Sequence, residues 1–213
     1  MRHLIANPED WVGAFRKLPN NLQLMTVHSL QSVAFNKTIR ARINENISLS
    51  TPVEGDIVGR VDENGQLETS SMVKVEQRTL NRISRNCKLG RLVVTGQLPG
   101  SRLDRSDGIV GEIENSVLKE MDLADTTWKV EQIGRLTTKG TRRPLVTTFS
   151  EFQFESVPLA GEETMSEKWT DGVKEGDLWN PEGACIRFRF TLPSGSYATT
   201  LLREFMRTPL QQL

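Results

Sequence analysis

The chain has 213 residues with 27 basic and 27 acidic side chains, so its formal net charge is zero. With 37% hydrophobic and 25% charged residues it has the composition of a globular protein, and binding to nucleic acid through bulk positive charge is disfavoured. No apolar run is long enough to cross a bilayer, and two distant cysteines offer neither a disulfide framework nor a zinc pattern. We therefore expect a reduced, metal-free, cytoplasmic protein.

The first 45 residues predict two helices, a short one over residues 8–17 and a long one over residues 22–44. On the long helix, one expected packing side is formed by Val27, Leu30, Ala34, Thr38 and Ala41. Gln31 falls within that side, and Asn36 lies near two isoleucines on the opposite side. Because buried amides need partners, each is expected either to bond to a neighbouring element or to contact a ligand.

A β-rich stretch follows, with strands expected within residues 51–58, 72–75 and 92–95. A helix is expected over residues 77–88, with Leu80, Ile83 and Cys87 on its apolar side. Its opposite side carries a basic stripe formed by Arg78, Arg82, Arg85 and Lys88. Such a stripe is either an ordinary solvated helix face or a surface that follows phosphates.

Residues 96–108 predict a loop, and residues 109–123 an amphipathic helix with solvated acids, including Glu114, on its outer surface. The segment 139–144 is the most concentrated basic loop of the chain. Three cations, Lys139, Arg142 and Arg143, are expected to project from it toward phosphates, which would position RNA without reading its sequence.

The last third predicts strands over residues 144–149, 152–157 and 184–192, with a charged excursion over residues 159–182. A Pro-Ser-Gly turn then leads into a buried helix that opens at Ser196 or Tyr197. Its apolar stripe is formed by Ala198, Leu201, Leu202, Phe205 and Met206. Tyr197, the single tyrosine of the chain, is either a plug at the end of a core or a pocket wall for a flat polar ring.

Four motifs occur in order along this chain. They are His28-Ser-Leu-Gln-Ser-Val-Ala-Phe-Asn36, Pro52-Val-Glu-Gly-Asp-Ile-Val58, Lys139-Gly-Thr-Arg-Arg143 and Leu192-Pro-Ser-Gly-Ser-Tyr-Ala-Thr-Thr-Leu-Leu-Arg-Glu204. Together they resemble the TruD family of tRNA pseudouridine synthases. The resemblance implies an α+β fold, in which an antiparallel catalytic sheet with helices is interrupted by an inserted α/β domain. On that basis residues 1–45 and 150–213 are expected to belong to the catalytic domain, and residues 46–149 to the insertion.

One family element is missing from this sequence. The catalytic aspartate of the family lies upstream of these motifs, in a Gly-x-x-Asp-x-x-Ala-x-Thr-like stretch that does not occur here, and Asp56 belongs to the different Val-Glu-Gly-Asp segment. The chain therefore resembles the C-terminal half of such an enzyme. We expect the missing N-terminal half to be its partner and these residues alone to isomerise nothing.

The resemblance also implies the chemistry and the site. Uridine in tRNA is converted to pseudouridine by breaking the C–N glycosidic bond, turning the base and rejoining it through carbon, which needs no metal and no redox cofactor. The target base must leave its stack. Tyr197 is the candidate pocket aromatic, Arg203 a candidate supporting or ion-pairing cation, and Gln31 and Asn36 are candidate substrate contacts. The alternative is a non-catalytic RNA-binding protein that keeps the TruD-like fold.

Overall fold

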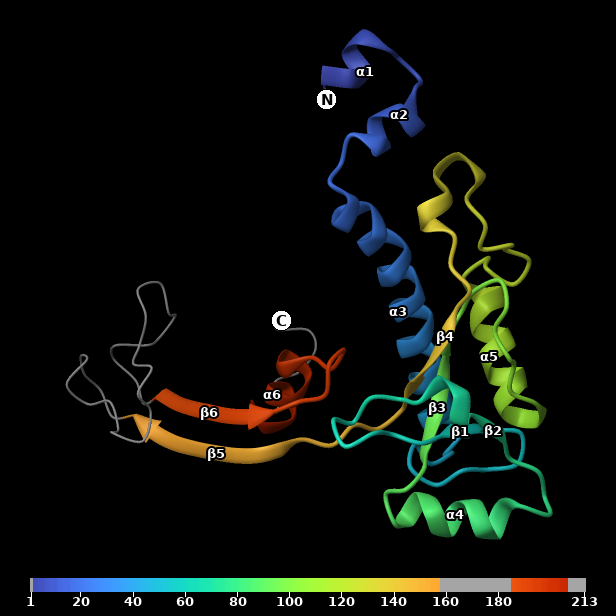
Figure 1. Ribbon diagram of the computed structural model, residues 1–213, viewed down its shortest axis with the longest axis vertical. Coiled ribbons are helices and arrows are strands. Elements are labelled where there is room, and N and C mark those ends of the chain that lie inside the picture. The colour runs from blue at the N-terminus through green and yellow to red at the C-terminus, as the bar shows by residue number, and fades with distance from the viewer. Residues whose placement is uncertain (1, 158–184, 207–213) are drawn as a thin grey trace. The chain divides into compact units, whose positions relative to one another are not determined.

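The computed structural model describes residues 2–157 and 185–206, and the chain divides into two compact units, residues 1–146 and 147–213 (Figure 1). The described helices are α1 (Arg2–Ala6), α2 (Trp11–Arg16), α3 (Asn20–Asn44), α4 (Leu80–Lys88), α5 (Gly108–Glu120) and α6 (Ala198–Met206). The described strands are β1 (Ile57–Gly59), β2 (Val73–Lys74), β3 (Val93–Leu98), β4 (Thr141–Pro144), β5 (Ser150–Val157) and β6 (Cys185–Thr191), and two 3₁₀ turns are η1 (Thr69–Ser71) and η2 (Glu131–Leu136). None of these helices is long and apolar enough to span a bilayer. The expected excursion over residues 159–182 lies outside the described residues.

The first unit is built on a four-stranded antiparallel sheet with strand order β2-β1-β3-β4. Helix α4 closes a small core on this sheet with Ile83, which packs with Val58, Val75 and Val94. Leu80 and Cys87 pack against the same cluster, as their helical spacing predicts. Gly90 follows α4 with φ +68°, a left-handed conformation that ends the helix at low cost for a residue without a Cβ.

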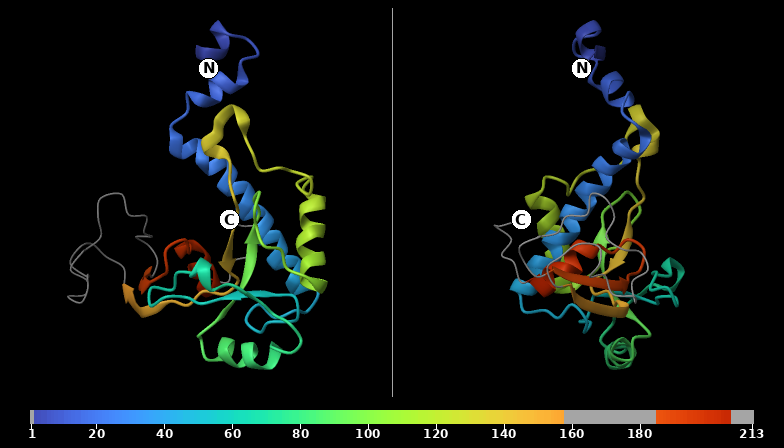
Figure 2. Two further views of the ribbon diagram at one scale, coloured as in Figure 1. Left: turned by 45° about the vertical axis from the view of Figure 1, so that its right-hand side comes forward. Right: turned by 90° about the vertical axis from the view of Figure 1, so that its left-hand side faces the viewer.

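Helix α3 packs against β3 and α5, and Figure 1 shows α3 and α5 beside β3 and β4. Its buried side is largely polar, since Gln23, Gln31, Thr38 and Arg42 are buried together with Ala34 and Phe35. The predicted packing side was therefore partly wrong, because Leu30 is exposed. Figure 2 shows α1 and α2 beyond the N-terminal end of α3.

The prediction for the Lys139–Pro144 segment was also wrong in its local structure. Residues 141–144 form β4, whereas the strand expected over residues 144–149 is not formed. Thr95 of β3 pairs with Pro144, and Gly96 pairs with Arg143. Side chains in a strand alternate between the two faces of the sheet, so successive residues of β4 have opposite environments.

The second unit contains an antiparallel pair of strands, β5 and β6, and helix α6. Phe205 of α6 stacks on Phe152 of β5 with ring centroids 5.0 Å apart, and on Phe188 of β6 at 5.4 Å. Helix α6 was expected to be buried, but none of its described residues is fully buried. Within the described residues, the strands β5 and β6 cover only one side of this helix.

Candidate nucleic-acid interface

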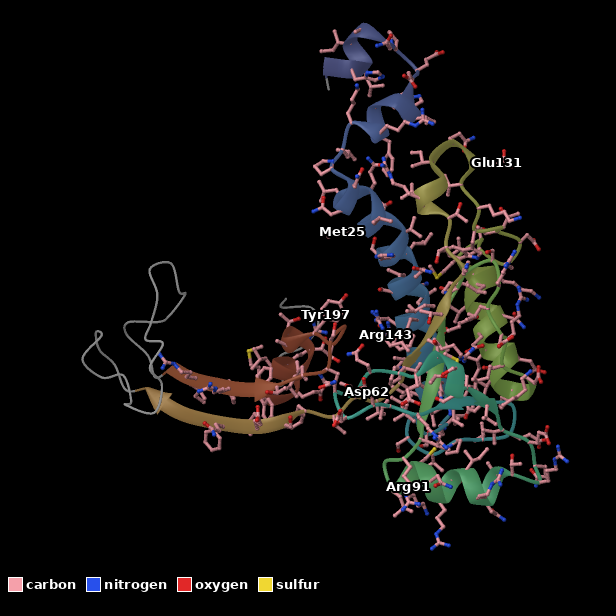
Figure 3. The ribbon with its side chains drawn as sticks, viewed as in Figure 1. Met25, Asp62, Arg91, Glu131, Arg143 and Tyr197 are labelled. Carbon is pink, nitrogen blue, oxygen red and sulfur yellow. The ribbon has the colours of Figure 1, made fainter. Side chains whose placement is uncertain are left out.

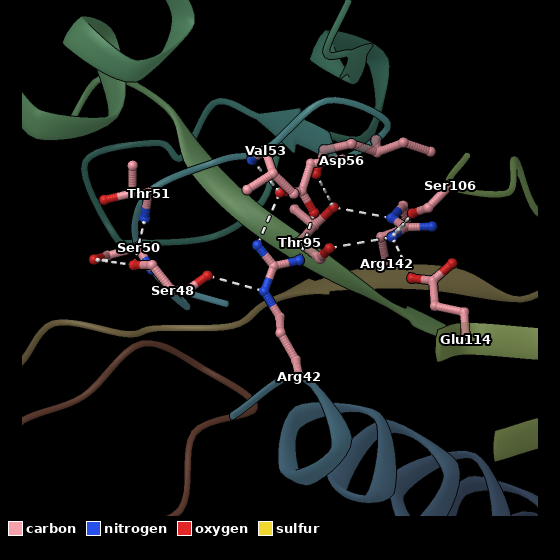
Figure 4. Close-up of polar contacts among 11 residues, drawn as sticks. Arg42, Ser48, Ser50, Thr51, Val53, Asp56, Thr95, Ser106, Glu114 and Arg142 are labelled. Carbon is pink, nitrogen blue, oxygen red and sulfur yellow. Dashed lines mark hydrogen bonds and ion pairs between the residues drawn. The ribbon is translucent and has the colours of Figure 1, made fainter. Parts of the chain in front are cut away.

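Arg142 lies inside the first unit, and only 3% of its surface is exposed. Its guanidinium makes an ion pair with Glu114 (Nη2 to Oε1, 2.7 Å) and donates to the Thr95 hydroxyl and carbonyl at 2.9 and 3.1 Å (Figure 4). It also donates to the Ser106 hydroxyl at 2.9 Å and to the Asp104 carbonyl at 3.0 Å. The expectation that Arg142 projects from a loop was therefore wrong, because the alternation of β4 points it into the protein.

Glu114 was expected on a solvated helix face, and it is buried instead. One of its oxygens is bound by Arg142, while Oε2 has no hydrogen-bond partner among the described residues. A carboxylate tolerates such burial only beside a cation, since the transfer of an unpaired charge out of water is costly. The ion pair therefore accounts for the burial of both Arg142 and Glu114, although these residues lie 28 positions apart in the chain.

The neighbours of Arg142 keep the access to solvent that was expected of them. Lys139 is exposed before β4, and the following Gly140 adopts φ +80°. Arg143 is half-buried, with its guanidinium carbon 5.2 Å from the centre of the Phe35 ring (Figure 3). That ring, supplied by α3, holds the cation in place through a cation–π contact while leaving part of it in solvent.

The predicted basic stripe is divided by the structure. Arg78 lies before the first residue of α4 and forms an ion pair with Glu76, whose hydrogen bond raises the pKa of the guanidinium above its ordinary value. Arg82 and Arg85 are exposed on α4 and form no ion pair within residues 2–157 and 185–206. An arginine whose charge is matched locally attracts phosphate less, so Arg82 and Arg85 are the stronger candidates.

The two amides singled out on the long helix have different environments. Gln31 is buried and its Nε2 donates to the Pro99 carbonyl at 2.7 Å and to the Thr138 hydroxyl at 3.1 Å. It thus joins α3 to two loops, which is the structural alternative considered for it. Asn36 was treated as a buried amide that needs a partner, but it is exposed, and its side chain makes no hydrogen bond to a described residue.

Tyr197 lies at the start of α6 and is 60% exposed (Figure 3). Gly195, with φ +84°, makes the turn before it, and the Tyr197 carbonyl accepts the first amides of the helix, from Thr200 at 3.0 Å and Leu201 at 3.3 Å. The phenol is therefore not a plug within the described core. It stands in solvent at a helix start, where a flat ring has room to stack on it.

Arg203 is partly buried in α6, and its Nε has no hydrogen-bond partner among the described residues. Arg203 was expected to be a supporting or ion-pairing cation, but within the described part of the chain it forms no ion pair, not even with the neighbouring Glu204. Successive residues of a helix point in different directions, which explains this result. The guanidinium is left with hydrogen-bonding capacity.

The most deeply buried carboxylate is that of Asp56, which is held by Arg42 of α3 through two hydrogen bonds of 2.6 and 2.8 Å (Figure 4). Its Oδ2 also accepts the Val53 amide at 2.8 Å. Asp56 is fully enclosed, so it has no access to a substrate sugar. Sequence reasoning missed this pair, because an arginine on the buried side of a helix resembles an ordinary surface cation. No cluster of three His, Cys, Asp or Glu side chains suited to a metal occurs within residues 2–157 and 185–206.

These observations define a protein of mixed helices and antiparallel sheet, with solvent-facing arginines, a lysine and a tyrosine. Comparison with known proteins is specific: a family model described as tRNA pseudouridine synthase D (TruD) matches residues 1–205. The chain therefore belongs to the TruD family, and the α+β fold implied by the sequence motifs is confirmed.

Relatives from archaea are described as probable tRNA pseudouridine synthase D. The one from Methanosarcina mazei is 42% identical over 212 residues, which are 99% of this chain and 44% of the relative. One from Thermococcus sibiricus is 32% identical over 93% of this chain and 41% of its own length. A crystal structure of the TruD protein from Methanosarcina mazei matches with a TM-score of 0.76 and 40% identity, over all of this chain and 44% of that one. The chain thus spans less than half the length of these relatives.

Proposed function

We propose that this chain forms part of a tRNA pseudouridine synthase, in which it binds RNA and completes the uridine pocket, while the catalytic aspartate comes from a segment outside these residues. The observation that carries the proposal is the family match over residues 1–205 combined with coverage of only 44% of the Methanosarcina mazei relative. We infer that the remaining part of such an enzyme is the partner of this chain, with tRNA as the substrate.

The surface of α3 supports a missing partner. Leu22, Met25, Leu30 and Val33 are all exposed, and Met25 is 59% exposed. Figure 3 shows Met25 on the side of α3 turned away from α5. Scattered exposed apolar residues are normal, but here four of them lie on one helix, among polar neighbours, while several polar side chains of the same helix are buried. A second protein segment on that side would bury these residues.

The second unit supports the same inference independently. An isolated pair of strands is marginally stable in water, and each strand of such a pair has an edge without a neighbour. Phe154 and Ile186, on facing strands, are exposed. Further strands and a covering layer from the catalytic part of the enzyme would satisfy both the edges and these apolar side chains.

Tyr197 and Arg203 are our candidates for the uridine site. The exposed ring of Tyr197 suits stacking of a uracil that has left its helix, a contact worth about 1–3 kcal/mol per base. The Nε of Arg203 is buried and has no hydrogen-bond partner within residues 2–157 and 185–206, which suits an ion pair with a carboxylate brought by the missing segment. That carboxylate acts on the sugar while the base is turned, and the two side chains of this unit hold the base and the acid.

Lys139, Arg143, Arg82 and Arg85 are our candidates for phosphate contacts. All four keep solvent access, and none forms an ion pair within the described part of the chain. Arg142 is left out because its charge is neutralised internally. Asn36, which is exposed and makes no hydrogen bond to a described residue, stays a candidate substrate contact, whereas Gln31 joins α3 to its loops.

The test is complementation. The chain is coexpressed with the part of the Methanosarcina mazei relative that it does not match, and tritium release from tRNA carrying [5-³H]uridine is measured. We expect no release by the chain alone and release by the mixture. Tyr197→Ala is expected to lower kcat/KM of the mixture by roughly 5–150-fold, the equivalent of about 1–3 kcal/mol, and Tyr197→Phe much less.

The outcomes separate the candidates. Turnover by the chain alone contradicts its incompleteness. A mixture that binds tRNA without releasing tritium favours the non-catalytic RNA-binding alternative. The double variant Met25→Ser with Val33→Ser is expected to weaken assembly of the mixture in gel filtration, whereas Lys119→Ser, on the exposed side of α5, serves as the matched control and leaves assembly unchanged.

A further inference from the structure

A groove of about 950 Å³ opens in the first unit between α4 and the segment that joins β1 to β2. Three arginines from separate segments line it: Arg60 directly after β1, Arg82 on α4 and Arg91 after α4. Figure 3 shows Arg91 at the end of α4. Arg60 and Arg91 carried no signal in the sequence, because each is an isolated cation in its own segment.

The charge of this groove is not balanced from within. Glu68 is the single acid among the lining residues, against three guanidinium groups, and none of the three arginines forms an ion pair with a described residue. By contrast, Lys37 and Lys74 of the same unit have the carboxylates of Glu120 and Asp107 as partners. A concave surface with excess positive charge concentrates anions.

The backbone of each arginine is tied to the groove wall. The Arg60 amide donates to the Ser71 hydroxyl at 2.8 Å, and the Arg91 amide donates to the Asn86 carbonyl at 3.0 Å. The Asn86 side chain in turn donates to the Arg82 carbonyl at 2.8 Å. The starting points of the three side chains are therefore fixed, which lowers the conformational cost of gathering them around one ligand.

We propose that this groove binds the phosphodiester backbone of RNA. Its volume exceeds that of a single phosphate, and guanidinium groups match phosphate oxygens in a bidentate fashion. Its lining contains no aromatic ring on which a base would stack, so recognition is of the backbone and is independent of sequence. The proposal rests on the proposed function in one respect, that the RNA is the tRNA substrate, and it adds Arg60 and Arg91 to the phosphate contact already proposed for Arg82.

The test compares the double variant Arg60→Gln with Arg91→Gln to the control Lys119→Gln with Lys129→Gln, which also removes two exposed positive charges from the first unit. Binding of the full chain to a fluorescein-labelled tRNA transcript is measured by anisotropy at several salt concentrations. Loss of two phosphate contacts lowers the slope of log K against log salt by about 1.4, which at 0.1 M salt is on the order of a 25-fold loss of affinity. Arg60→Lys with Arg91→Lys keeps both charges, so it is expected to restore the salt dependence but only part of the affinity, because an ammonium group cannot bind two phosphate oxygens in a bidentate fashion.

Equal effects of the groove variant and the lysine control overturn the proposal, as does an undetectable affinity of the unaltered chain for the transcript. Competition by pyrophosphate as effective as that by a 12-residue oligouridylate overturns it in favour of a small-anion site. The proposed function is judged separately, by tritium release in the complemented enzyme. If the mixture releases no tritium but the groove variant still lowers the affinity for tRNA, the proposed synthase function is refuted and the proposal that the groove binds RNA is supported.

Discussion

Replacing Arg142 separates a structural arginine from an RNA-binding one. Arg142→Gln removes the charge that faces Glu114 while leaving the carboxylate at a buried position. Breaking a buried pair from one side costs about 3–5 kcal/mol, a large part of the 5–15 kcal/mol that stabilises a typical domain. With an m-value near 2 kcal/mol/M, the urea midpoint of the chain is expected to fall by about 2 M.

The assay is urea unfolding followed by far-UV circular dichroism, with Arg143→Gln as the matched control. Arg143 is half-buried over Phe35, and its cation–π contact is worth about 0.5–1 kcal/mol, so its midpoint is expected to move little. Arg142→Met combined with Glu114→Leu is expected to be more stable than Arg142→Met alone, because the double change leaves no buried charge.

One result would refute this reasoning about Arg142. If Arg142→Gln unfolds at the midpoint of the unaltered chain and loses tRNA affinity as Arg143→Gln does, its guanidinium is in solvent and the internal network is not formed. The expected pattern is the reverse: Arg142→Gln changes stability, and Arg143→Gln changes tRNA affinity.

Three further predictions concern stability and reactivity. The hydrogen bond from His3, followed by that from the Gly13 amide, holds the pKa of Asp10 below its ordinary 3.8. The stability that the Asp10 carboxylate gives α2 is therefore present above pH 3.8 and is lost as the pH falls through the lowered pKa. Amide hydrogen exchange in α2 between pH 6 and pH 3 should show this loss, and Asp10→Asn should abolish its pH dependence. Burial, followed by the charge of Asp56, raises the pKa of the Cys87 thiol, so peptide mass spectrometry should show slower alkylation by iodoacetamide at pH 8 than for a free thiol. Gly55→Ala is expected to cost at least about 1–3 kcal/mol in urea unfolding, because Gly55 has φ +88° and a Cβ would lie 2.1 Å from the Asp107 carbonyl oxygen.

The parts of the fold that could be predicted are those in which local pattern and burial agree. Helix α4 has its apolar residues on one side, and Ile83 lies in the core as the spacing predicts. The turn at Gly195 and the helix after it are also as expected, with the start of α6 moved to Ala198. Here a short helix packs one apolar side on a sheet, so its spacing alone specifies its orientation.

The Lys139–Arg143 segment shows where such reasoning fails. A glycine, a proline and three cations within six residues are typical of an exposed loop, yet residues 141–144 pair with β3 and turn Arg142 inward. The residues near Arg142 in the sequence do not predict its partners, since Glu114 comes from α5 and Thr95 from β3. Long-range ion pairs of this kind depend on tertiary packing, which a single sequence does not reveal.

The predicted packing side of helix α3 was partly wrong for a related reason, and this difference bears most directly on function. Its polar side is buried because Arg42 binds Asp56 and Gln31 binds the Pro99 carbonyl, so each buried polar group is satisfied. Ala34 and Phe35 are buried with them, but other apolar residues, including Met25 and Val33, are left in solvent. Hydrophobic side chains that gain nothing from the packing of their own unit are explained economically by a surface supplied from elsewhere. In the other unit, the described strands form a sheet of two, which points to the same conclusion from hydrogen bonding rather than hydrophobicity. Two physical arguments, one from each unit, therefore favour our proposal that this chain acts together with a further protein segment.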